Sequence, residues 1–441
     1  MEGNPQWGPV LKVPVQISEG DDIVLDLLSL CTHVIRNHFS ILLLSALPTL
    51  PPGVLKRKYA KPRLYREQLR MNVMATKNPI LKYRSFSYIA TQQPPLQTSA
   101  SLSVLGYKVQ PGIFAVTRTW HSLMQRMRKS FVPSILQPDF TWPRPMPPRI
   151  LQTTPPVPHA PGKTVRIIWG VVHKSLYYFS QWYCSWFGIH FDAKVVQLPF
   201  GLVMKWTDRT SVEEAISMQM ARAAGIPVPK VLGCGEHPND PFNRTFSILM
   251  TRLPGITLEN SNDELEPDAE EPWLEELKIC VQSMRLWRPP SQEVVCSPLG
   301  TKLRSSRVPG HVMGPFADQK DFHSYLLSPA SKHGFKSDAE YEEALSRAKK
   351  LQQRRFQIVF THGDFKAHNI LVDDNGHLSG FLDWESAGWY PEYWEFTTAM
   401  RFGRDSWWFQ VASWIGGNQY LDELDSDIAL NQLTVDSYIA F

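Results

Sequence analysis

The stretch THGDFKAHNILVDDNGHLSGFLDWE, residues 361–385, decides the fold because it sets acidic and amide side chains beside short apolar runs. The preceding run IVF and the runs ILV and GFL predict short strands, and DDNG between the last two predicts the turn of a hairpin. We therefore expect Asp364, Asn369 and Asp383 to converge at one edge of this hairpin. Carboxylates gather in this way only where a cation relieves their repulsion, and carboxylate and amide oxygens suit Mg²⁺. The stretch predicts a site in which metal and phosphate satisfy the polar groups.

The region before this stretch combines strands and a helix in an order typical of a small sheet lobe. AKVVQLPFGLVMKW contains two runs rich in β-branched residues, 194–198 and 201–206, and PFG between them predicts a hairpin. Lys205 closes the second run. In TSVEEAISMQMARAAGIPVPKVLG, Ser211 is a suitable helix N-cap and Gly225 a suitable C-cap. TFSILMTRLPG predicts a further strand, after which the pattern becomes mainly helical, so we expect a small sheet lobe hinged to a larger lobe.

Two longer segments have apolar residues at helical spacing. VRIIWGVVHKSLYYFSQWYCSWFG predicts an amphipathic or buried helix whose aromatic residues belong to a core. EPWLEELKICVQSMRLW places Leu274, Leu277, Val281 and Met284 on one face, which predicts a core helix of the second lobe.

The charge of the chain is unevenly distributed. Residues 51–150 hold 17 Lys and Arg against 2 acidic residues, which leaves 29 basic and 40 acidic groups elsewhere from totals of 46 and 42. The basic tract LKRKYAKPRLYREQLR is typical of a poorly ordered, solvated extension. Contact of this tract with nucleic acid or with an anionic membrane is less favoured, because the aromatic and glycine spacing of an RNA-binding module is absent.

A proline-rich segment predicts where the domains divide. Eight prolines between residues 143 and 161 cannot propagate a helix and are typical of a linker. We therefore expect a basic N-terminal extension over residues 1–162, an N-lobe over 163–255 and a C-lobe over 256–441.

Composition and cysteine usage indicate a globular protein of a reducing compartment. Apolar residues make up 43% and charged residues 20% of the 441 residues, enough for more than one domain. The five cysteines form no C-x-x-C pair, so we expect a cytoplasmic protein. The strongest apolar run, FSILLLSALPTLPPGV, is shorter than the ~20 residues that span a bilayer, and MEGNPQWGPVLKV does not read as a targeting peptide.

With these motifs the sequence resembles the aminoglycoside phosphotransferase and choline kinase-like family. The matching motifs are HGDFKAHNILV with GFLDWE, GLVMKW, IPVPKVLG and ILMTRLPG, in the right order over about residues 190–405. FLDWESAGWYPEYWE is especially similar to the fungal phosphotransferase domain proteins of this family. The resemblance implies an α+β, bilobal protein-kinase-like fold with a small antiparallel-sheet N-lobe and a mainly helical C-lobe.

The resemblance also implies an activity and its cofactors. It implies an ATP- and Mg²⁺-dependent phosphotransferase that moves the γ-phosphoryl group to a hydroxyl of a small molecule. Asp364 would be the catalytic aspartate that orients or deprotonates this hydroxyl, and Asn369 and Asp383 would hold Mg²⁺ on the nucleotide phosphates. The spacing is that of the kinase motif H-R-D-x-x-x-x-N.

The resemblance assigns the nucleotide site to the N-lobe. Lys205 would neutralise α- and β-phosphate oxygens, and Glu214, or failing it Glu213, would hold this lysine in place. The segment from Met250 to Leu253 would supply apolar walls and backbone hydrogen bonds for adenine. His362 is expected to brace the loop rather than to transfer protons.

Two departures from kinases keep other interpretations open. QLPFG holds a single glycine, so no glycine-rich loop precedes Lys205. Lys366 gives the spacing D-x-K-x-x-N of protein kinases and could reach the γ-phosphate, which keeps a protein Ser/Thr substrate as an alternative. The missing D-F-G and A-P-E motifs weigh against it. A catalytically weak nucleotide-binding pseudokinase or scaffold is the third interpretation.

The acceptor is the least defined part of the prediction. GWYPEYWEFTTAMRFGRDSWWFQVASW is aromatic and carries Glu392, Glu395 and Asp405, which could line an acidic, ring-stacking pocket for a small amine-bearing hydroxyl compound. The favoured interpretation is that most of these aromatics belong to a helical core. Glu385 is expected to be a surface residue, although it is close enough to Asp383 to touch a second metal.

Overall fold

The N-terminal lobe is built on a four-stranded antiparallel sheet with the strand order β1-β2-β4-β3. The computed structural model describes residues 132–143, 150–259, 265–270, 272–401 and 403–434, all within one unit of the chain, residues 111–441. The strands are β1 (Val195–Leu198), β2 (Leu202–Lys205), β3 (Val231–Glu236) and β4 (Phe246–Thr251). The predicted hairpin is confirmed, since β1 pairs with β2 across a turn in which Phe200 and Gly201 have φ values of 63° and 59°.

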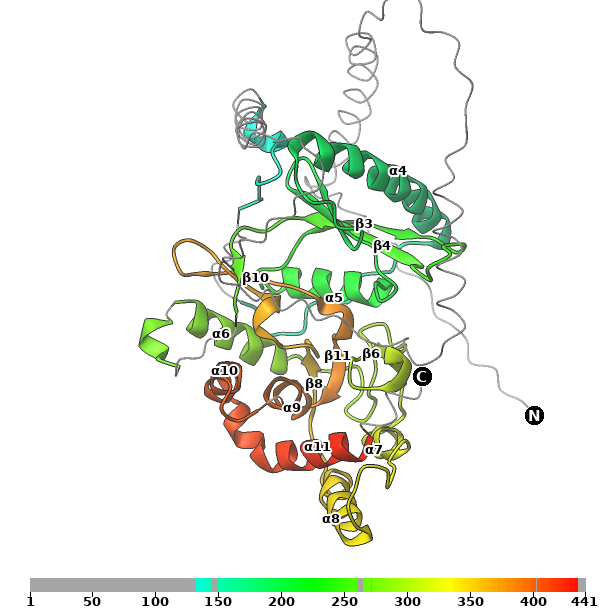
Figure 1. Cartoon of the computed structure of the whole chain (residues 1–441), viewed down its shortest axis with the longest axis vertical. Helices are drawn as coiled ribbons and strands as arrows, with labels where there is room; N and C mark the ends of the chain where they lie inside the picture. The colour runs from blue at the N-terminus through cyan, green and yellow to red at the C-terminus, as the bar shows by residue number, and fades with distance from the viewer. Residues whose placement is uncertain (1–131, 144–149, 260–264, 271, 402, 435–441) are drawn as a thin grey trace, which may run out of the picture. The chain divides into compact units, whose positions relative to one another are not determined.

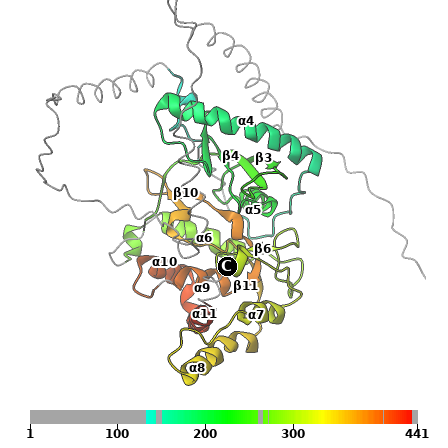
Figure 2. The same ribbon diagram turned by 45° about the vertical axis from the view of Figure 1, so that its right-hand side comes forward.

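Helices cover both faces of this sheet. The helix α4 (Lys163–Phe187) lies along one face and α5 (Val212–Ala223) along the other (Figure 1, Figure 2). The helix α4 approaches β3 so closely that a Cβ atom at Gly235 would lie 2.7 Å from His173 Nδ1. The predicted N-cap of α5 is confirmed, since Ser211 Oγ accepts a hydrogen bond from Glu214 N at 3.3 Å. The C-cap is Ala224, one residue before the predicted Gly225, which follows with a φ of 89°.

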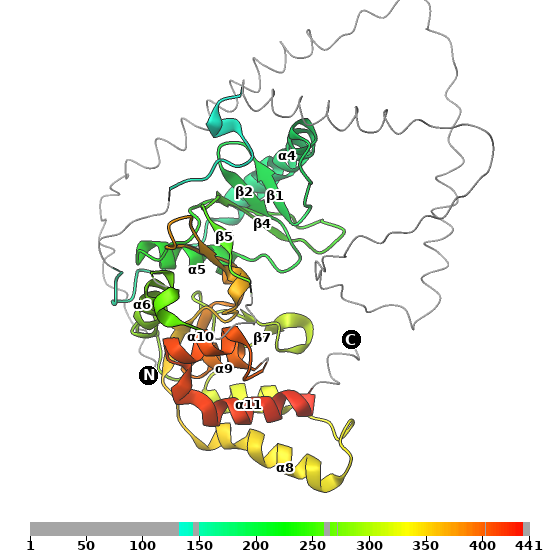
Figure 3. The same ribbon diagram turned by 60° about the vertical axis from the view of Figure 1, so that its left-hand side comes forward.

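The C-terminal lobe is mainly helical. Its helices are α6 (Trp273–Arg285), α7 (Gln319–Leu327), α8 (Asp338–Lys349), α9 (Trp394–Met400), α10 (Trp407–Ile415) and α11 (Leu421–Thr434). Short strands β6 (Leu303–Arg304) and β7 (Val312–Met313) pair with each other. The predicted core helix is confirmed, because Leu274, Leu277, Val281 and Met284 are all buried in α6. Figure 3 shows α8 and α11 packed side by side. The predicted bilobal architecture is therefore confirmed.

The decisive stretch forms the hairpin expected from its sequence. The strands β9 (Ile370–Val372) and β10 (Leu378–Phe381) pair, and β5 (Ile256–Thr257) adds to β9. The strand β8 (Ile358–Thr361), before the hairpin, pairs with β11 (Gly388–Pro391), after it, so that Thr361 lies opposite Gly388. This pairing brings the loop of residues 362–369 next to the segment that follows β10.

Residues 132–143, here called the N-terminal strap, are bound to the N-lobe. Ile135 O accepts a hydrogen bond from Phe200 N at 2.8 Å, and Trp142 Nε1 donates to Phe200 O at 2.9 Å. Trp142 N donates to Arg252 O at 2.9 Å. The strap therefore ties the β1–β2 turn to the hinge segment that follows β4.

Residues 150–162 have the non-helical form that their prolines predict, and helix begins only at Lys163. These residues are also bound to both lobes. Leu151 N donates to Ala224 O at 2.9 Å, and Trp287 Nε1, in the C-lobe, donates to Leu151 O at 3.2 Å. The predicted linker thus makes specific contacts with the domain, which its sequence did not indicate. The predicted domain boundaries stay predictions.

Several expectations fall outside the described residues. The basic tract, the apolar run 39–54 and Cys31 are among them, while the other four cysteines are buried. Within the described ranges, no helix combines the length and the hydrophobicity that crossing a membrane requires.

Replacing Trp142 with alanine is expected to lower the free energy of unfolding by about 2 kcal/mol, because an indole contact and its hydrogen bond to the β1–β2 turn are lost. Chemical denaturation of the full-length protein measures this change. The control is Trp182→Ala on α4, whose side chain is 49% exposed and should matter little. Equal effects of the two substitutions would show that the strap does not stabilise the domain.

Candidate active site

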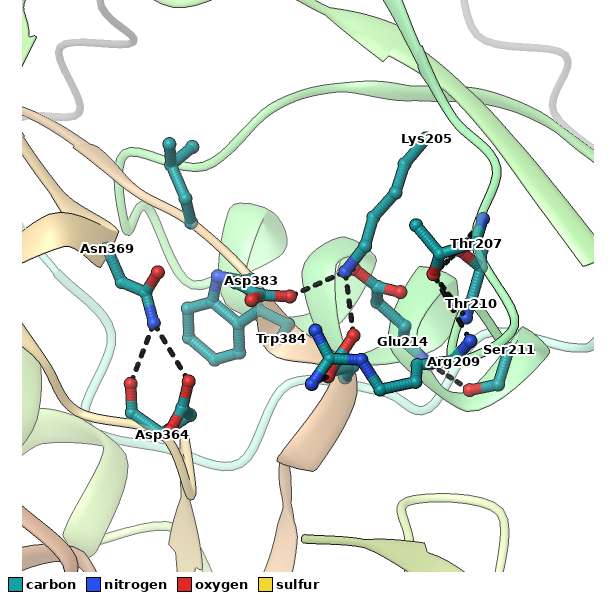
Figure 4. A network of polar contacts seen from close by, with 12 residues as sticks. Lys205, Thr207, Arg209, Thr210, Ser211, Glu214, Asp364, Asn369, Asp383 and Trp384 are labelled. Atoms are coloured by element: carbon teal, nitrogen blue, oxygen red, sulfur yellow. Dashed lines mark hydrogen bonds and ion pairs between the residues drawn. The ribbon is translucent and has the colours of Figure 1, made fainter. Parts of the chain in front are cut away.

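Lys205 stands at the centre of a cluster that joins the two lobes (Figure 4). Its Nζ atom lies 2.8 Å from Glu214 Oε1, 2.5 Å from Asp383 Oδ1 and 3.0 Å from Glu385 Oε2. Glu214 comes from α5, Asp383 follows β10, and Glu385 lies in the short helix η7 (Trp384–Ser386). One ammonium group therefore contacts three carboxylates that are distant in the sequence.

The electrostatics of this cluster keep the lysine charged. Burial alone would lower the pKa of Lys205, but the carboxylates of Glu214, Asp383 and Glu385 outweigh burial and raise this pKa above its ordinary value. Burial raises the pKa of Glu214 to about 7, although Lys205 opposes the shift. Burial would also raise the pKa of Asp383, but Lys205 lowers it below its usual value. Asp383 is therefore ionised at neutral pH.

The backbone of Asp383 has an unusual conformation that directs its side chain. Its φ of 63° lies in the left-handed region, which costs free energy for most residues but is tolerated by Asp and Asn. Trp384 anchors the turn by donating its indole hydrogen bond to Phe381 O at 2.8 Å. The chain thus reverses directly after β10 and points the Asp383 carboxylate at Lys205.

A second group of polar residues lies on the loop of residues 362–369. Asn369 Nδ2 donates to Asp364 O at 2.8 Å and to Asp364 Oδ2 at 3.3 Å. Lys366 Nζ lies 2.6 Å from Asp364 Oδ1, an atom that is buried and accepts no well-aligned hydrogen bond from the described residues. Figure 4 shows Asp383 between Lys205 and Asn369, with the Asn369 amide oxygen directed away from Asp364. The structure thus brings the residues predicted for catalysis and metal binding together.

Two buried residues hold this loop in place. Glu395 accepts hydrogen bonds from His362 N at 2.6 Å and Gly363 N at 3.1 Å. His362 Nε2 lies 2.8 Å from Leu382 O, and His362 Nδ1 accepts from Asp364 N at 3.3 Å. Burial lowers the pKa of His362 to about 4, so the imidazole is neutral and can donate from one nitrogen while it accepts at the other. Its position agrees with the bracing role expected from the sequence.

The position of Glu395 corrects an alternative raised by the sequence. Glu395 was a candidate for an acidic acceptor pocket, but it is buried beneath the loop, and burial raises its pKa to about 7 against the pull of the two backbone N–H groups. Asp405 is exposed, and Glu392 accepts a hydrogen bond from Tyr420 Oη at 3.0 Å. The aromatic residues Trp389, Tyr390, Tyr393, Trp394, Phe396, Trp407 and Trp408 are buried, which favours the core interpretation.

The sequence missed the role of Glu385 and of a nearby arginine. Glu385 was expected at the surface, but its side chain is only 8% exposed and contacts Lys205. Its second oxygen lies 3.3 Å from Arg209 Nη1. Arg209 lies between β2 and α5, and no local pattern links it to residues after β10. Only the pairing of the two lobes brings it here.

The residues predicted to contact adenine lie at the hinge. Leu253 is buried, and a Cβ atom at Gly380 of β10 would lie 3.2 Å from its Cδ1 atom, so this side chain packs between the lobes. Met250 is half-buried in β4, opposite Val203. Between them in the sequence, the backbone N–H of Arg252 donates a hydrogen bond to Gly201 O at 2.7 Å.

The donor atoms near Asp383 fit a hard cation. Mg²⁺ needs only one or two protein carboxylates when phosphates and water complete its shell. Within the described ranges, no group of three or more His, Cys, Asp or Glu side chains has metal-binding geometry. The ionised Asp383 carboxylate and the amide oxygen of Asn369 are the hard oxygens that such a shared site requires.

A small antiparallel lobe and a mainly helical lobe, joined by a cluster of one lysine and three carboxylates, give this chain a protein-kinase-like fold. Residues 192–426, more than half of the 441-residue chain, match the family model described as the phosphotransferase enzyme family. The chain belongs to this family, so the predicted family is confirmed. No curated protein sequence gave a significant match.

The solved structures that the chain matches over part of its length include several phosphotransferases. A thermostable mutant of the aminoglycoside phosphotransferase APH(4)-Ia, in a ternary complex with AMP-PNP and hygromycin B, is 15% identical over 54% of this chain and 79% of its own, with a TM-score of 0.39. The aminoglycoside phosphotransferase APH(3'')-Id from Streptomyces rimosus is 18% identical over 53% of this chain and 86% of its own, with a TM-score of 0.33. A choline/ethanolamine kinase family protein from Mesorhizobium loti is 14% identical over 56% of this chain and 77% of its own, with a TM-score of 0.33. Similarity this low does not indicate a substrate.

Proposed function

We propose that this protein transfers the γ-phosphoryl group of ATP, with Mg²⁺, to a hydroxyl group of a small molecule. The observation that carries the proposal is the contact of Lys205 with both Glu214 and Asp383 at 2.8 and 2.5 Å, close to the Asp364 and Asn369 pair. Phosphoryl transfer needs positioned positive charge and an aligned hydroxyl more than covalent chemistry by the protein.

The N-lobe and the hairpin would divide the work of nucleotide binding. Lys205, held by Glu214, would contact α- and β-phosphate oxygens. Asn369 and Asp383 would hold Mg²⁺, which supplies charge neutralisation on the phosphates. Met250 and Leu253 would border the adenine. These roles are supported by the charge of Lys205, the ionised state of Asp383 and the buried position of Leu253.

The loop of residues 362–369 would carry out the transfer itself. Asp364 would orient the acceptor hydroxyl and accept its proton as the hydroxyl oxygen bonds to the γ-phosphorus. The bond from that phosphorus to the bridging oxygen breaks, and ADP leaves. Lys366, 2.6 Å from the Asp364 carboxylate, would reach the γ-phosphate from the same side. His362 and Glu395 would hold the loop and are positioning residues.

Turnover by the purified full-length protein tests this proposal. ATP and Mg²⁺ are supplied with a pool of small hydroxyl compounds in one sample and a generic protein substrate in another. We expect Mg²⁺-dependent ADP formation with label on a small molecule. Label on the protein substrate alone would support the protein kinase alternative, and ATP binding without turnover would support the pseudokinase alternative.

Replacing Lys205 with methionine is expected to lower kcat/KM for ATP by about 10²-fold, since positioned charge on the phosphates is lost. The stability without nucleotide should fall as well, because three carboxylates lose their shared cation. Steady-state kinetics and a melting curve measure the two effects. Lys349→Met, at an exposed position on α8, is the control and should change neither. Unchanged kinetics in the Lys205 variant would exclude its phosphate-binding role.

The cytoplasmic location and the domain boundaries at 162/163 and 255/256 complete the proposal. Helix α4 begins at Lys163, which supports the first boundary as the start of the N-lobe, although residues 132–143 and 150–162 before it hydrogen-bond to the lobes. The hinge after β4 supports the second boundary. Fluorescent tagging in cells tests the location, and limited proteolysis tests the boundaries.

A further inference from the structure

Arg209 lies in a short turn between β2 and α5 that is built from buried threonines. Thr207 Oγ1 accepts hydrogen bonds from Arg209 N at 3.2 Å and Thr210 N at 3.1 Å. Thr207 N donates to Thr210 Oγ1 at 3.1 Å, and the two hydroxyls lie 3.0 Å apart. Ser211 then caps α5. The backbone that carries Arg209 is therefore fixed by side-chain hydrogen bonds.

The guanidinium group of Arg209 reaches into the lysine cluster. Its Nη1 atom lies 3.3 Å from Glu385 Oε1, while Glu385 Oε2 lies 3.0 Å from Lys205 Nζ. One carboxylate thus bridges two cations. The Arg209 side chain is 47% exposed, in contrast to 12% for Lys205, so Arg209 is the more solvent-exposed of the two cations.

The β1–β2 turn does not lie beside Lys205 as Arg209 does. A Cβ atom at Gly201 would lie 2.8 Å from Phe140 Cδ1, because the turn is packed against the N-terminal strap near the hinge. Lys205 is at the other end of β2 from this turn. The single glycine of this turn therefore lies away from the lysine cluster, whereas the Arg209 guanidinium lies beside that cluster.

Taking the proposed function as given, we propose that Arg209 binds the terminal phosphates of the nucleotide. Its guanidinium would exchange Glu385 for phosphate oxygens, which it can contact through two parallel hydrogen bonds. Glu385 would hold Arg209 in the site when phosphates are not bound. Positive charge at the γ-phosphate also stabilises the charge that develops during transfer.

The test uses the full-length protein with Arg209→Gln and Arg209→Lys. The control is Arg355→Gln, an exposed arginine that, like Arg209, pairs with a glutamate, here Glu293 at 2.9 Å. KM and kcat for ATP are measured, together with the melting-temperature shifts caused by ATP, ADP and AMP in Mg²⁺.

We expect Arg209→Gln to raise KM for ATP by about 10- to 100-fold, the effect of losing a charged hydrogen bond. In this variant the melting-temperature shift caused by ATP should fall toward the shift caused by AMP. AMP has a single phosphate, which should not contact Arg209. Arg209→Lys should recover part of the difference, and Arg355→Gln should match the unsubstituted protein.

The outcomes separate a phosphate contact from a structural role. If Arg209→Gln melts at a lower temperature without nucleotide but keeps the KM for ATP and the order of nucleotide shifts, Arg209 is only a structural partner of Glu385 and the inference is overturned. If the unsubstituted protein binds no ATP, the proposed function fails, and this inference fails with it. If ATP binds equally well to the unsubstituted protein and to Arg209→Gln, the Arg209 inference is overturned and the proposed function is not.

Discussion

Replacing Asp364 with asparagine is expected to lower kcat by about 10³-fold while KM for ATP changes little. An amide of the same shape can still accept a hydrogen bond from the acceptor hydroxyl, but it cannot take the proton, and general-base catalysis typically contributes 10²- to 10⁴-fold. Asn369 donates to Asp364 at both the backbone and the side-chain oxygen, so the loop should keep its form in the variant. The change should therefore act on transfer rather than on binding.

The measurement is single-turnover transfer from ATP to the labelled acceptor, with ATP binding followed separately. Asp374→Asn is a matched control, because Asp374 lies exposed in the turn between β9 and β10. Full transfer activity in the Asp364 variant would exclude it as the catalytic base and would direct attention to other groups near the acceptor. Loss of ATP binding would instead show that Asp364 acts through the metal site.

The architecture could be predicted from local sequence signals, because each helix or hairpin is marked by its own capping or turn residues. The β1–β2 turn is marked by PFG, α5 by Ser211 and Gly225, and the β9–β10 hairpin by DDNG between apolar runs. These are short-range signals of strand pairing, capping and turn formation. They are sufficient here because each element is bounded by residues that favour its ends.

The neighbours of the site were harder to predict because they depend on long-range packing. Glu395 is 33 residues from His362 along the chain, and Arg209 reaches Glu385 only because α5 and η7 pack together. The contacts of the proline-rich residues 150–162 were missed for another reason. Proline content predicts an extended backbone, but it does not show whether that backbone hydrogen-bonds to a domain, as Leu151 does here.

Replacing Asp383 with asparagine is expected to abolish the Mg²⁺-dependent part of ATP binding and to lower kcat/KM by on the order of 10³-fold. Asp383 has a φ of 63°, and asparagine is among the few residues that tolerate this conformation, so the substitution removes a charge with little added backbone strain. Lys205 would still contact Glu214 and Glu385, so the stability without ligand should change less than in Lys205→Met.

The measurement is the melting temperature with ATP, with and without Mg²⁺. A ligand at 100 times its Kd stabilises a protein by ~2.7 kcal/mol, so loss of binding should be plainly visible. We expect the unsubstituted protein to gain much more stability from ATP when Mg²⁺ is present than when it is absent, and Asp383→Asn to gain the same small amount in both conditions. Asp374→Asn should behave like the unsubstituted protein. A full Mg²⁺-dependent shift in Asp383→Asn would place the metal on other oxygens, because an amide cannot replace the charge that a carboxylate gives to a divalent cation. Since Lys205 and Mg²⁺ would both draw on the Asp383 carboxylate, its loss should weaken nucleotide binding more than the loss of any other group in the cluster.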